Sequence, residues 1–309
     1  MNTRDDIIIP PALKPGDTLG IAAPAGWFEK ERFRRGLAVI EAMGFHVAVP
    51  EDLFKKNRYM AGTDEHRARL FNRLIADDAV KGIFCARGGF GSMRILSFLD
   101  MAAIRAHPKV IAGFSDISLL LTVIAEKTGM VTFHAPVVTS LADAEDVTRT
   151  AMVEALTGSR ILEIKAAEGV SIVPGTAEGR VTGGNLASLC HLIGTPWQPD
   201  FDGCILFLED TNEPAYRIDR MLSQMRLAGC LDGVTGMVLG AFENCGHREV
   251  IHEIVREQAP AGIPVLGGMA AGHGPVNITL PLGLTATLDV DHHRLRYREA
   301  AVNGRKDVS

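Results

Sequence analysis

The first half of the chain alternates short apolar runs with longer segments in which apolar residues recur every three or four positions. Residues 18–23 form such a run and end at Pro24, and residues 29–43 then place apolar side chains along one face of a helix. Strands separated by helices of this length predict parallel β-α units with helices on both faces of a sheet. The same pattern predicts strands over residues 45–49, 80–86 and 110–114, and helices over residues 64–75 and 92–99.

The second half has a different pattern, in which β-rich pieces are interrupted by glycine. It predicts an α+β or small-barrel domain that differs from the parallel sheet before it. We therefore expect an α/β protein with an amino-terminal domain over residues 1–150, a linker over residues 151–178 and a β-rich carboxyl-terminal domain over residues 179–309. The β-rich pieces are residues 179–182, 204–208, 234–242 and 284–290, with helices over residues 186–193 and 216–227.

Composition narrows the classes of protein to consider. The 309 residues carry a formal net charge of −5 with 22% charged residues, so there is no basic footprint for nucleic acid. The five cysteines show no C-x-x-C spacing and read as buried thiols in a reducing compartment. The amino terminus lacks the apolar core of a signal peptide, and no apolar run is long enough to cross a membrane. We expect a cytoplasmic protein without membrane or nucleic-acid partners.

The most informative motif is residues 113–116, Gly-Phe-Ser-Asp, between an apolar strand and an apolar helix. A serine at such a strand-turn-helix junction is lifted clear of the sheet edge, close to the amino end of the helix. Both features suit a nucleophile. The motif departs from G-x-S-x-G because Asp116-Ile117 follows the serine. A serine before aspartate is also typical of a helix N-cap, so Ser115 has two interpretations from the motif alone.

A glycine turn follows the strand over residues 80–86. Residues 87–92, Arg-Gly-Gly-Phe-Gly-Ser, let the backbone approach a ligand and leave N–H groups free to donate. The turn could hold an anion, or it could supply an oxyanion donor beside Ser115. It does not match G-x-G-x-x-G, and a plain tight turn remains an alternative.

Two further segments carry candidate acid and base groups. The apolar residues 205–208 run into Glu209 and Asp210, so at least one carboxylate lies at the carboxyl edge of a strand, where it could orient a histidine. Its alternatives are loop solvation or a helix cap. His273 is flanked by glycines and followed by Pro275, so it belongs to a loop and its imidazole is accessible, as a general base requires. The other histidines lack metal-ligand spacing, so no metal site is expected.

The order Ser115, Glu209, His273 is that of nucleophile, acid and base in α/β-hydrolases. Together the segments resemble the LD-carboxypeptidase family of serine peptidases, the muramoyl-tetrapeptide carboxypeptidases and their microcin-immunity relatives. The resemblance covers nearly the whole chain. It is carried by residues 14–17, 22–25, 87–91, 113–116, 183–186, 194–196, 208–210, 216–220 and 272–274.

The resemblance implies roles for particular residues. Ser115 would be the nucleophile, with Glu209 and His273 as its partners in a site between the two domains. The N–H groups of Asp116 and Gly89 would form the oxyanion hole, with Gly88 a possible substitute that also contacts substrate. The implied fold is a flavodoxin-like domain joined to an unrelated β-rich domain, in a chain that needs no metal or organic cofactor and forms a homodimer.

The expected function is removal of the terminal D-alanine from muropeptide tetrapeptides during cytoplasmic peptidoglycan recycling. The segment over residues 213–220 favours this branch of the family over the microcin-immunity branch. Because muropeptides carry several carboxylates, Arg87 is the first candidate for substrate binding, whereas Arg217 and Arg220 are expected in structural ion pairs. Two alternatives remain: an immunity peptidase of the same chemistry, and a non-enzymatic module that binds anions through residues 87–91.

Overall fold

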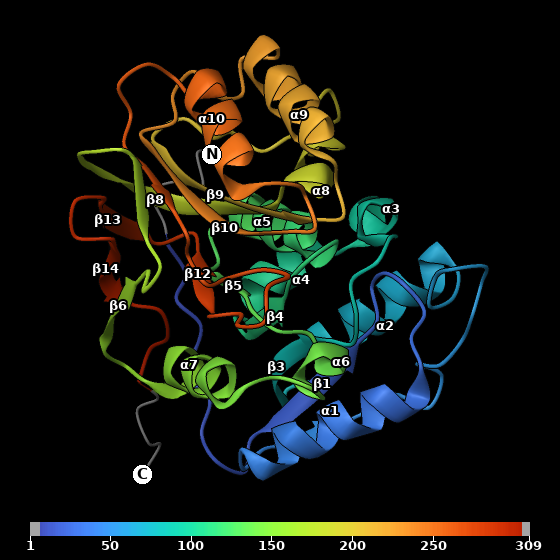
Figure 1. The fold of residues 1–309 in the computed structure, drawn as a ribbon. Helices are drawn as coiled ribbons and strands as arrows, with labels where there is room; N and C mark the ends of the chain where they lie inside the picture. Colours follow the sequence, from blue (N-terminus) through green and yellow to red (C-terminus); the bar gives the residue numbers. More distant parts are fainter. Residues whose placement is uncertain (1–6, 305–309) are drawn as a thin grey trace.

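The computed structural model describes residues 7–304, and its amino-terminal half contains a parallel sheet (Figure 1). Four strands of this sheet follow the predicted apolar runs. Two were not predicted: the short strand over residues 132–134, and a strand from far along the chain that pairs antiparallel with it. The parallel strands are β1 (Thr18–Ala22), β2 (His46–Ala48), β3 (Val80–Cys85), β4 (Val110–Gly113) and β5 (Thr132–His134), and the added strand is β12 (Leu280–Leu282). The order across the sheet is β12-β5-β4-β3-β1-β2.

Helices connect these strands, as the periodicity predicts. The helices Lys30–Ala42, Asp64–Ala76 and Ile117–Thr128 match predicted segments, whereas residues 92–98 form one α-turn followed by a 3₁₀ turn. They are α1 (Lys30–Ala42), α2 (Asp64–Ala76), α3 (Ser92–Ile95), η1 (Leu96–Phe98), α4 (Met101–Ala106), α5 (Ile117–Thr128), α6 (Val138–Leu141) and α7 (Asp146–Thr157). α5 is buried along most of its length because it packs between this sheet and a second one.

The second sheet is mixed. Its strands are β6 (Ile161–Lys165), β7 (Val170–Val173), β8 (Thr176–Asn185), β9 (Cys204–Thr211), β10 (Gly236–Glu243), β11 (Val265–Gly267), β13 (Thr285–Asp289) and β14 (Arg294–Ala300). They follow the order β6-β14-β13-β8-β9-β10-β11-β7, in which β8 to β11 are parallel and the outer pairs antiparallel. The expected α/β class, a parallel sheet followed by a second β-rich part, is confirmed.

Residues 151–178, expected to be a linker, contain the end of α7 and the strands β6 and β7. These two strands form the edges of the second sheet, so the segment is part of that sheet. They are short and separated by Gly169, and little periodicity was available to reveal them. The division of the chain at residues 150 and 179 otherwise stays a prediction.

Alternate residues of β9 face two different cores. Ile205 and Phe207 pack with the residues of the first sheet, whereas Leu206 and Leu208 pack beneath the helices α8 (Leu186–Cys190), α9 (Ala215–Leu227) and α10 (Arg248–Gln258). Figure 1 shows these three helices together on the side of β9 and β10 that faces away from α5. Burial on both faces explains why β9 is a continuous apolar run. The side chain at position 209 then falls on the face of β9 turned toward the first sheet.

The chain crosses between the sheets after β11. Residues 268–279 leave the second sheet and lead into β12, which pairs antiparallel with β5, with Leu280 opposite His134. A buried hydroxyl adds to this connection, because Tyr297 of β14 donates a 2.9 Å hydrogen bond to the carbonyl of Pro281 in β12. The crossing places the loop that contains His273 between the two sheets.

Replacing the buried tyrosine tests the bond between the sheets. Tyr297→Phe should lower the free energy of unfolding by about 1–3 kcal/mol, because the buried Pro281 carbonyl loses its donor. Chemical denaturation followed by circular dichroism measures the change. Tyr59→Phe is the matched control, since the Tyr59 side chain is exposed, and it should change stability by less than about 0.5 kcal/mol. Equal stability of the two variants would contradict the assigned role of Tyr297.

Candidate active site

Ser115 occupies the turn between β4 and α5 in a conformation that non-glycine residues rarely adopt, with φ of 65°. Such backbone conformations cluster at functional sites, and a serine nucleophile at a strand-to-helix turn is one instance. The N-cap residue of α5 is Asp116, whose side chain makes no cap hydrogen bond to this helix. Ser115 is therefore not the helix cap, which was the alternative interpretation of the motif.

The Ser115 hydroxyl is hydrogen-bonded to an imidazole from the other half of the chain. Ser115 Oγ lies 3.1 Å from His273 Nε2, and His273 Nδ1 lies 2.6 Å from Glu209 Oε2. These distances are within the range for a nucleophile, a base and a group that orients the base. The structure thus brings together three side chains that the sequence places at positions 115, 209 and 273.

Glu209 and Asp210 point in opposite directions because they are neighbours on β9. Glu209 is fully buried and faces His273. Asp210 faces the start of α8, where its carboxylate accepts hydrogen bonds from Asn185 Nδ2 at 3.0 Å and from Ala187 N at 2.9 Å. Burial raises the pKa of Asp210 to about 6, although these hydrogen bonds act in the other direction. Asp210 therefore holds the end of the strand, and only Glu209 reaches the imidazole.

The loop around His273 fits closely over Glu209. Gly272 has φ of 105°, and a Cβ atom there would lie 2.5 Å from Glu209 Oε2, so only glycine allows this approach. The Gly272 N–H donates to Asn277 Oδ1 at 2.9 Å, and the His273 N–H donates to Glu209 Oε2 at 3.2 Å. The carboxylate thus holds both the backbone and the ring of His273 in place.

The electrostatics of His273 suit a base. Burial acts to lower the pKa of His273, but the hydrogen bond and negative charge of Glu209, together with the charge of Asp210, outweigh it and raise the pKa above its ordinary value. The imidazole is consequently stabilised in the protonated form that it takes after accepting a proton. A carboxylate beside a histidine has this effect in serine peptidases.

The glycine turn after β3 lies directly against Ser115. A Cβ atom on Gly88 would lie 2.7 Å from Ser115 Cβ and 3.3 Å from Asp116 N, so the turn and the start of α5 are in contact. Within residues 7–304, neither the Asp116 N–H nor the Gly89 N–H donates to another protein group. Two backbone donors next to a serine hydroxyl are an arrangement that can stabilise an oxyanion.

Sequence reasoning missed the residue that holds this turn. The side chain of Arg67 is fully buried, and its guanidinium donates to the Gly91 carbonyl at 2.8 Å and to the Pro24 carbonyl. It also forms an ion pair with Asp64. Arg67 therefore ties the glycine turn to the loop after β1. The available signal was a charged residue on the apolar face of α2, one turn before Leu70 and Phe71.

Comparison with families of known proteins matches both halves of the chain. Residues 19–135 match the LD-carboxypeptidase N-terminal domain, and residues 178–288 match the LD-carboxypeptidase C-terminal domain. The chain belongs to the LD-carboxypeptidase family. It is therefore a peptidase by family, and the resemblance noted in the sequence is confirmed.

Individual relatives span both branches of this LD-carboxypeptidase family. The chain is 35% identical to the probable murein peptide carboxypeptidase of Bacillus subtilis, over 91% of each chain. It is 31% identical to the microcin C7 self-immunity protein MccF of Escherichia coli, over 95% of this chain and 96% of that one.

Solved structures of both kinds of relative also superpose on this chain. An MccF-like protein from Bacillus anthracis superposes with a TM-score of 0.89 at 26% identity, covering 94% of this chain and 99% of that one. The muramoyltetrapeptide carboxypeptidase from Oxalobacter formigenes superposes with a TM-score of 0.80 at 28% identity, covering 91% and 97%.

The other candidate arginines of this LD-carboxypeptidase-family chain have structural partners. Arg87 is exposed, and its guanidinium donates to the carbonyl of Trp27, which joins the glycine turn to the loop after β1. Arg217 forms an ion pair with Glu213, 3.3 Å away on the surface of α9. Arg220 lies 5.4 Å from the centre of the Tyr216 ring. The Arg217 contact is an ion pair of the kind that the sequence suggested, whereas the Arg220 contact is with an aromatic ring.

A second histidine lies close to the site without joining its hydrogen bonds. The fully buried ring of His134 at the end of β5 packs edge-on against Phe114 and Phe207, with ring centres 5.9 and 4.9 Å away. Burial lowers the pKa of His134 to about 4, so this ring is neutral at physiological pH. Sequence reasoning did not single it out, because it lies inside an apolar strand.

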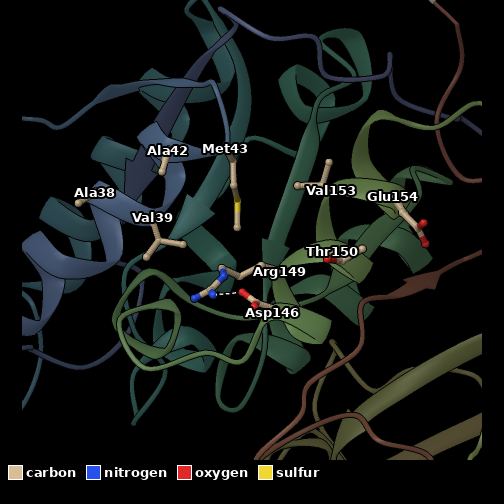
Figure 2. Close-up of a pocket in the computed structure, with 9 residues that line it drawn as sticks. All are labelled: Ala38, Val39, Ala42, Met43, Asp146, Arg149, Thr150, Val153 and Glu154. Atoms are coloured by element: carbon tan, nitrogen blue, oxygen red, sulfur yellow. Dashed lines mark hydrogen bonds and ion pairs between the residues drawn. The ribbon is translucent and has the colours of Figure 1, made fainter.

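Two cavities differ in volume and in their position relative to His273. A cavity of about 320 Å³ has Phe114 and His273 in its lining. A larger one of about 680 Å³ lies between α1 and α7, away from Ser115, Glu209 and His273, and Figure 2 shows the ion pair of Asp146 and Arg149 at its edge. Its lining consists of Ala38, Val39, Ala42, Met43, Asp146, Arg149, Thr150, Val153 and Glu154.

Among residues 7–304, no group of three or more histidine, cysteine, aspartate or glutamate side chains is arranged to hold a metal ion. Within the same residues, no helix is long and apolar enough to span a membrane.

Removing the charge at position 209 tests whether Glu209 raises the pKa of His273. In Glu209→Gln the pKa of His273 should fall below its ordinary value of about 6.5, because burial, the largest influence, is then opposed only by the smaller effect of the Asp210 charge. Titration of the imidazole by ¹⁵N nuclear magnetic resonance measures this directly. Glu178→Gln is the control, since Glu178 is an exposed residue of the same sheet paired with Arg298. An unchanged His273 midpoint in Glu209→Gln would refute the assigned cause.

Proposed function

We propose that this protein is a serine-type LD-carboxypeptidase that removes the terminal D-alanine from muropeptide tetrapeptides, in the cytoplasmic recycling of peptidoglycan. The observation that carries the proposal is the continuous hydrogen-bonded arrangement from Ser115 through His273 to Glu209. The family membership of the chain supports a peptidase. Its similarity to a murein peptide carboxypeptidase supports the substrate class.

In the proposed mechanism, His273 Nε2 takes the hydroxyl proton as Ser115 Oγ attacks the carbonyl of the penultimate, L-configured residue. Glu209 keeps the ring oriented and stabilises the imidazolium that forms. The oxyanion receives hydrogen bonds from the N–H groups of Asp116 and Gly89, each worth roughly 2.7–4 kcal/mol in comparable sites.

The leaving group then departs as a free amino acid. The imidazolium of His273 gives its proton to the amine of D-alanine, which leaves an acyl-enzyme on Ser115 Oγ. Water activated by the same imidazole releases the shortened peptide and restores the serine. The proposed steps use only groups of the protein and water.

A second candidate is an immunity peptidase that cleaves a toxic peptide-nucleotide conjugate by the same chemistry. The similarity to MccF over nearly the whole chain supports this second candidate. The substrate panel should therefore include a muramyl tetrapeptide and an aspartyl sulfamoyl adenosine. The proposal expects release of D-alanine from the first and slower or no cleavage of the second, both read by mass spectrometry.

The nucleophile is tested separately. Ser115→Ala should reduce kcat for the tetrapeptide by roughly 10⁴–10⁶-fold, as removal of a triad serine does, while unfolding remains cooperative. A fluorophosphonate probe should label the wild-type protein at Ser115 and leave Ser115→Ala unlabelled. If the probe labels neither protein and the wild-type protein shows no turnover, the result would favour the remaining alternative, a module that binds anions through residues 87–91.

A further inference from the structure

A peptidase that releases a single terminal residue must recognise the free carboxylate of that residue. The proton for the departing amine comes from His273 in the proposed mechanism, so the terminal residue lies beside this imidazole. Its carboxylate is separated from the amine by a single carbon atom. A receptor for the carboxylate therefore lies within a few ångströms of the His273 ring, and a cation is the expected partner.

The cavity of about 320 Å³ meets these conditions. His273 and Phe114 contribute to one part of its lining, and Arg32 of α1 contributes to the same lining. Pro136 and Pro275 add apolar surface that a small side chain could contact. Arg87, the arginine that the sequence suggested for substrate binding, is not part of this lining and donates to the Trp27 carbonyl instead.

The charges around Arg32 leave it able to bind an anion. Arg32 lies 3.0 Å from Asp143, and Arg35 lies 3.1 Å from the other oxygen of the same carboxylate. Two guanidinium groups thus share one carboxylate, which leaves a net positive charge at this end of the cavity. The side chains of Arg32 and Asp143 are each about half exposed, with 52% and 50% of their surface accessible, and ion pairs of this kind contribute little to stability. Arg32 can turn to a ligand while Arg35 keeps Asp143 paired.

We propose that Arg32 binds the terminal carboxylate of the substrate, and that the cavity between Arg32 and His273 holds the departing D-amino acid. This inference rests on the proposed function, because it takes His273 as the group that protonates the leaving amine. The ligand class is a small amino-acid residue with a free α-carboxylate. Arg32 thereby makes the enzyme a carboxypeptidase, since an internal peptide bond would bring no carboxylate to it.

Two substrates that differ in one group test the proposal. The first is the muramyl tetrapeptide with its free terminal carboxylate, and the second is the same peptide with a terminal carboxamide. Arg32→Gln should lower kcat/KM for the carboxylate by roughly 10- to 100-fold, the effect of losing one hydrogen-bonded charge, and change the carboxamide by less than about threefold. Arg35→Gln is the matched control. Arg35 is on the same helix and binds the same Asp143 but lies outside the cavity lining, so its substitution should preserve the preference for the carboxylate.

Three outcomes would overturn the proposal. An Arg32→Gln enzyme that keeps the wild-type preference would exclude Arg32 as the receptor. An equal fall for both substrates would assign Arg32 a structural role. An equal loss of preference in Arg35→Gln would assign the effect to the shared ion pair and not to direct contact.

Binding measurements separate this inference from the proposed function. Calorimetry is carried out with the Ser115→Ala variant and with the double variant Ser115→Ala, Arg32→Gln. Neither protein turns over substrate, so the measurement gives the affinity for both peptides. If the wild-type protein releases no D-alanine, the function is wrong. The carboxylate site still stands if Ser115→Ala prefers the carboxylate and Arg32→Gln removes that preference. Equal affinity of Ser115→Ala for the two peptides would overturn the site.

Discussion

The hydrogen bond between the buried Glu209 carboxylate and the His273 imidazole is the interaction on which the site depends. Its carboxylate comes from the centre of the second sheet, and its imidazole comes from the loop that leaves this sheet to pair with the first. Burial alone would lower the pKa of His273, and the charge of Glu209 reverses this effect. The imidazole can therefore accept a proton although little of its surface is exposed, because its charged form has a fixed partner.

The backbone around the site is arranged to permit close approach. Glycines at positions 88 and 272 let the turn after β3 contact Ser115 and let the His273 loop contact Glu209. Ser115 has a positive φ and its hydroxyl is hydrogen-bonded to the imidazole, and Arg67 holds the glycine turn by a charge-assisted hydrogen bond to the Gly91 carbonyl. Each of these features restricts the position of a backbone segment. Together they fix the backbone segments that carry Ser115 and His273, which is how preorganised sites are built.

The groups around the imidazole divide between two tasks. In the proposed mechanism, Ser115 and the backbone N–H groups of Asp116 and Gly89 act at the carbonyl that is attacked, and Glu209 orients the imidazole. In the further proposal, Arg32 and the apolar residues near His273 bind the group that leaves. Such a division would explain why only one terminal residue is cleaved, since the attacked carbonyl and the terminal carboxylate would be recognised by different groups.

The α/β class, most strands and helices of the first half, and the residue types of the site follow from local sequence patterns. Strand-turn-helix order around Ser115, an apolar strand before Glu209 and glycines around His273 are local properties, and they survive in any fold that keeps these elements. Position in space is not local. The folded structure was needed to show that β12 crosses to the first sheet and that residues 161–173 join the second sheet. It was also needed to place Arg67 against the glycine turn and Arg32 in the cavity beside His273. Those contacts join residues far apart in the chain, so their energies depend on packing, which no short window of sequence contains.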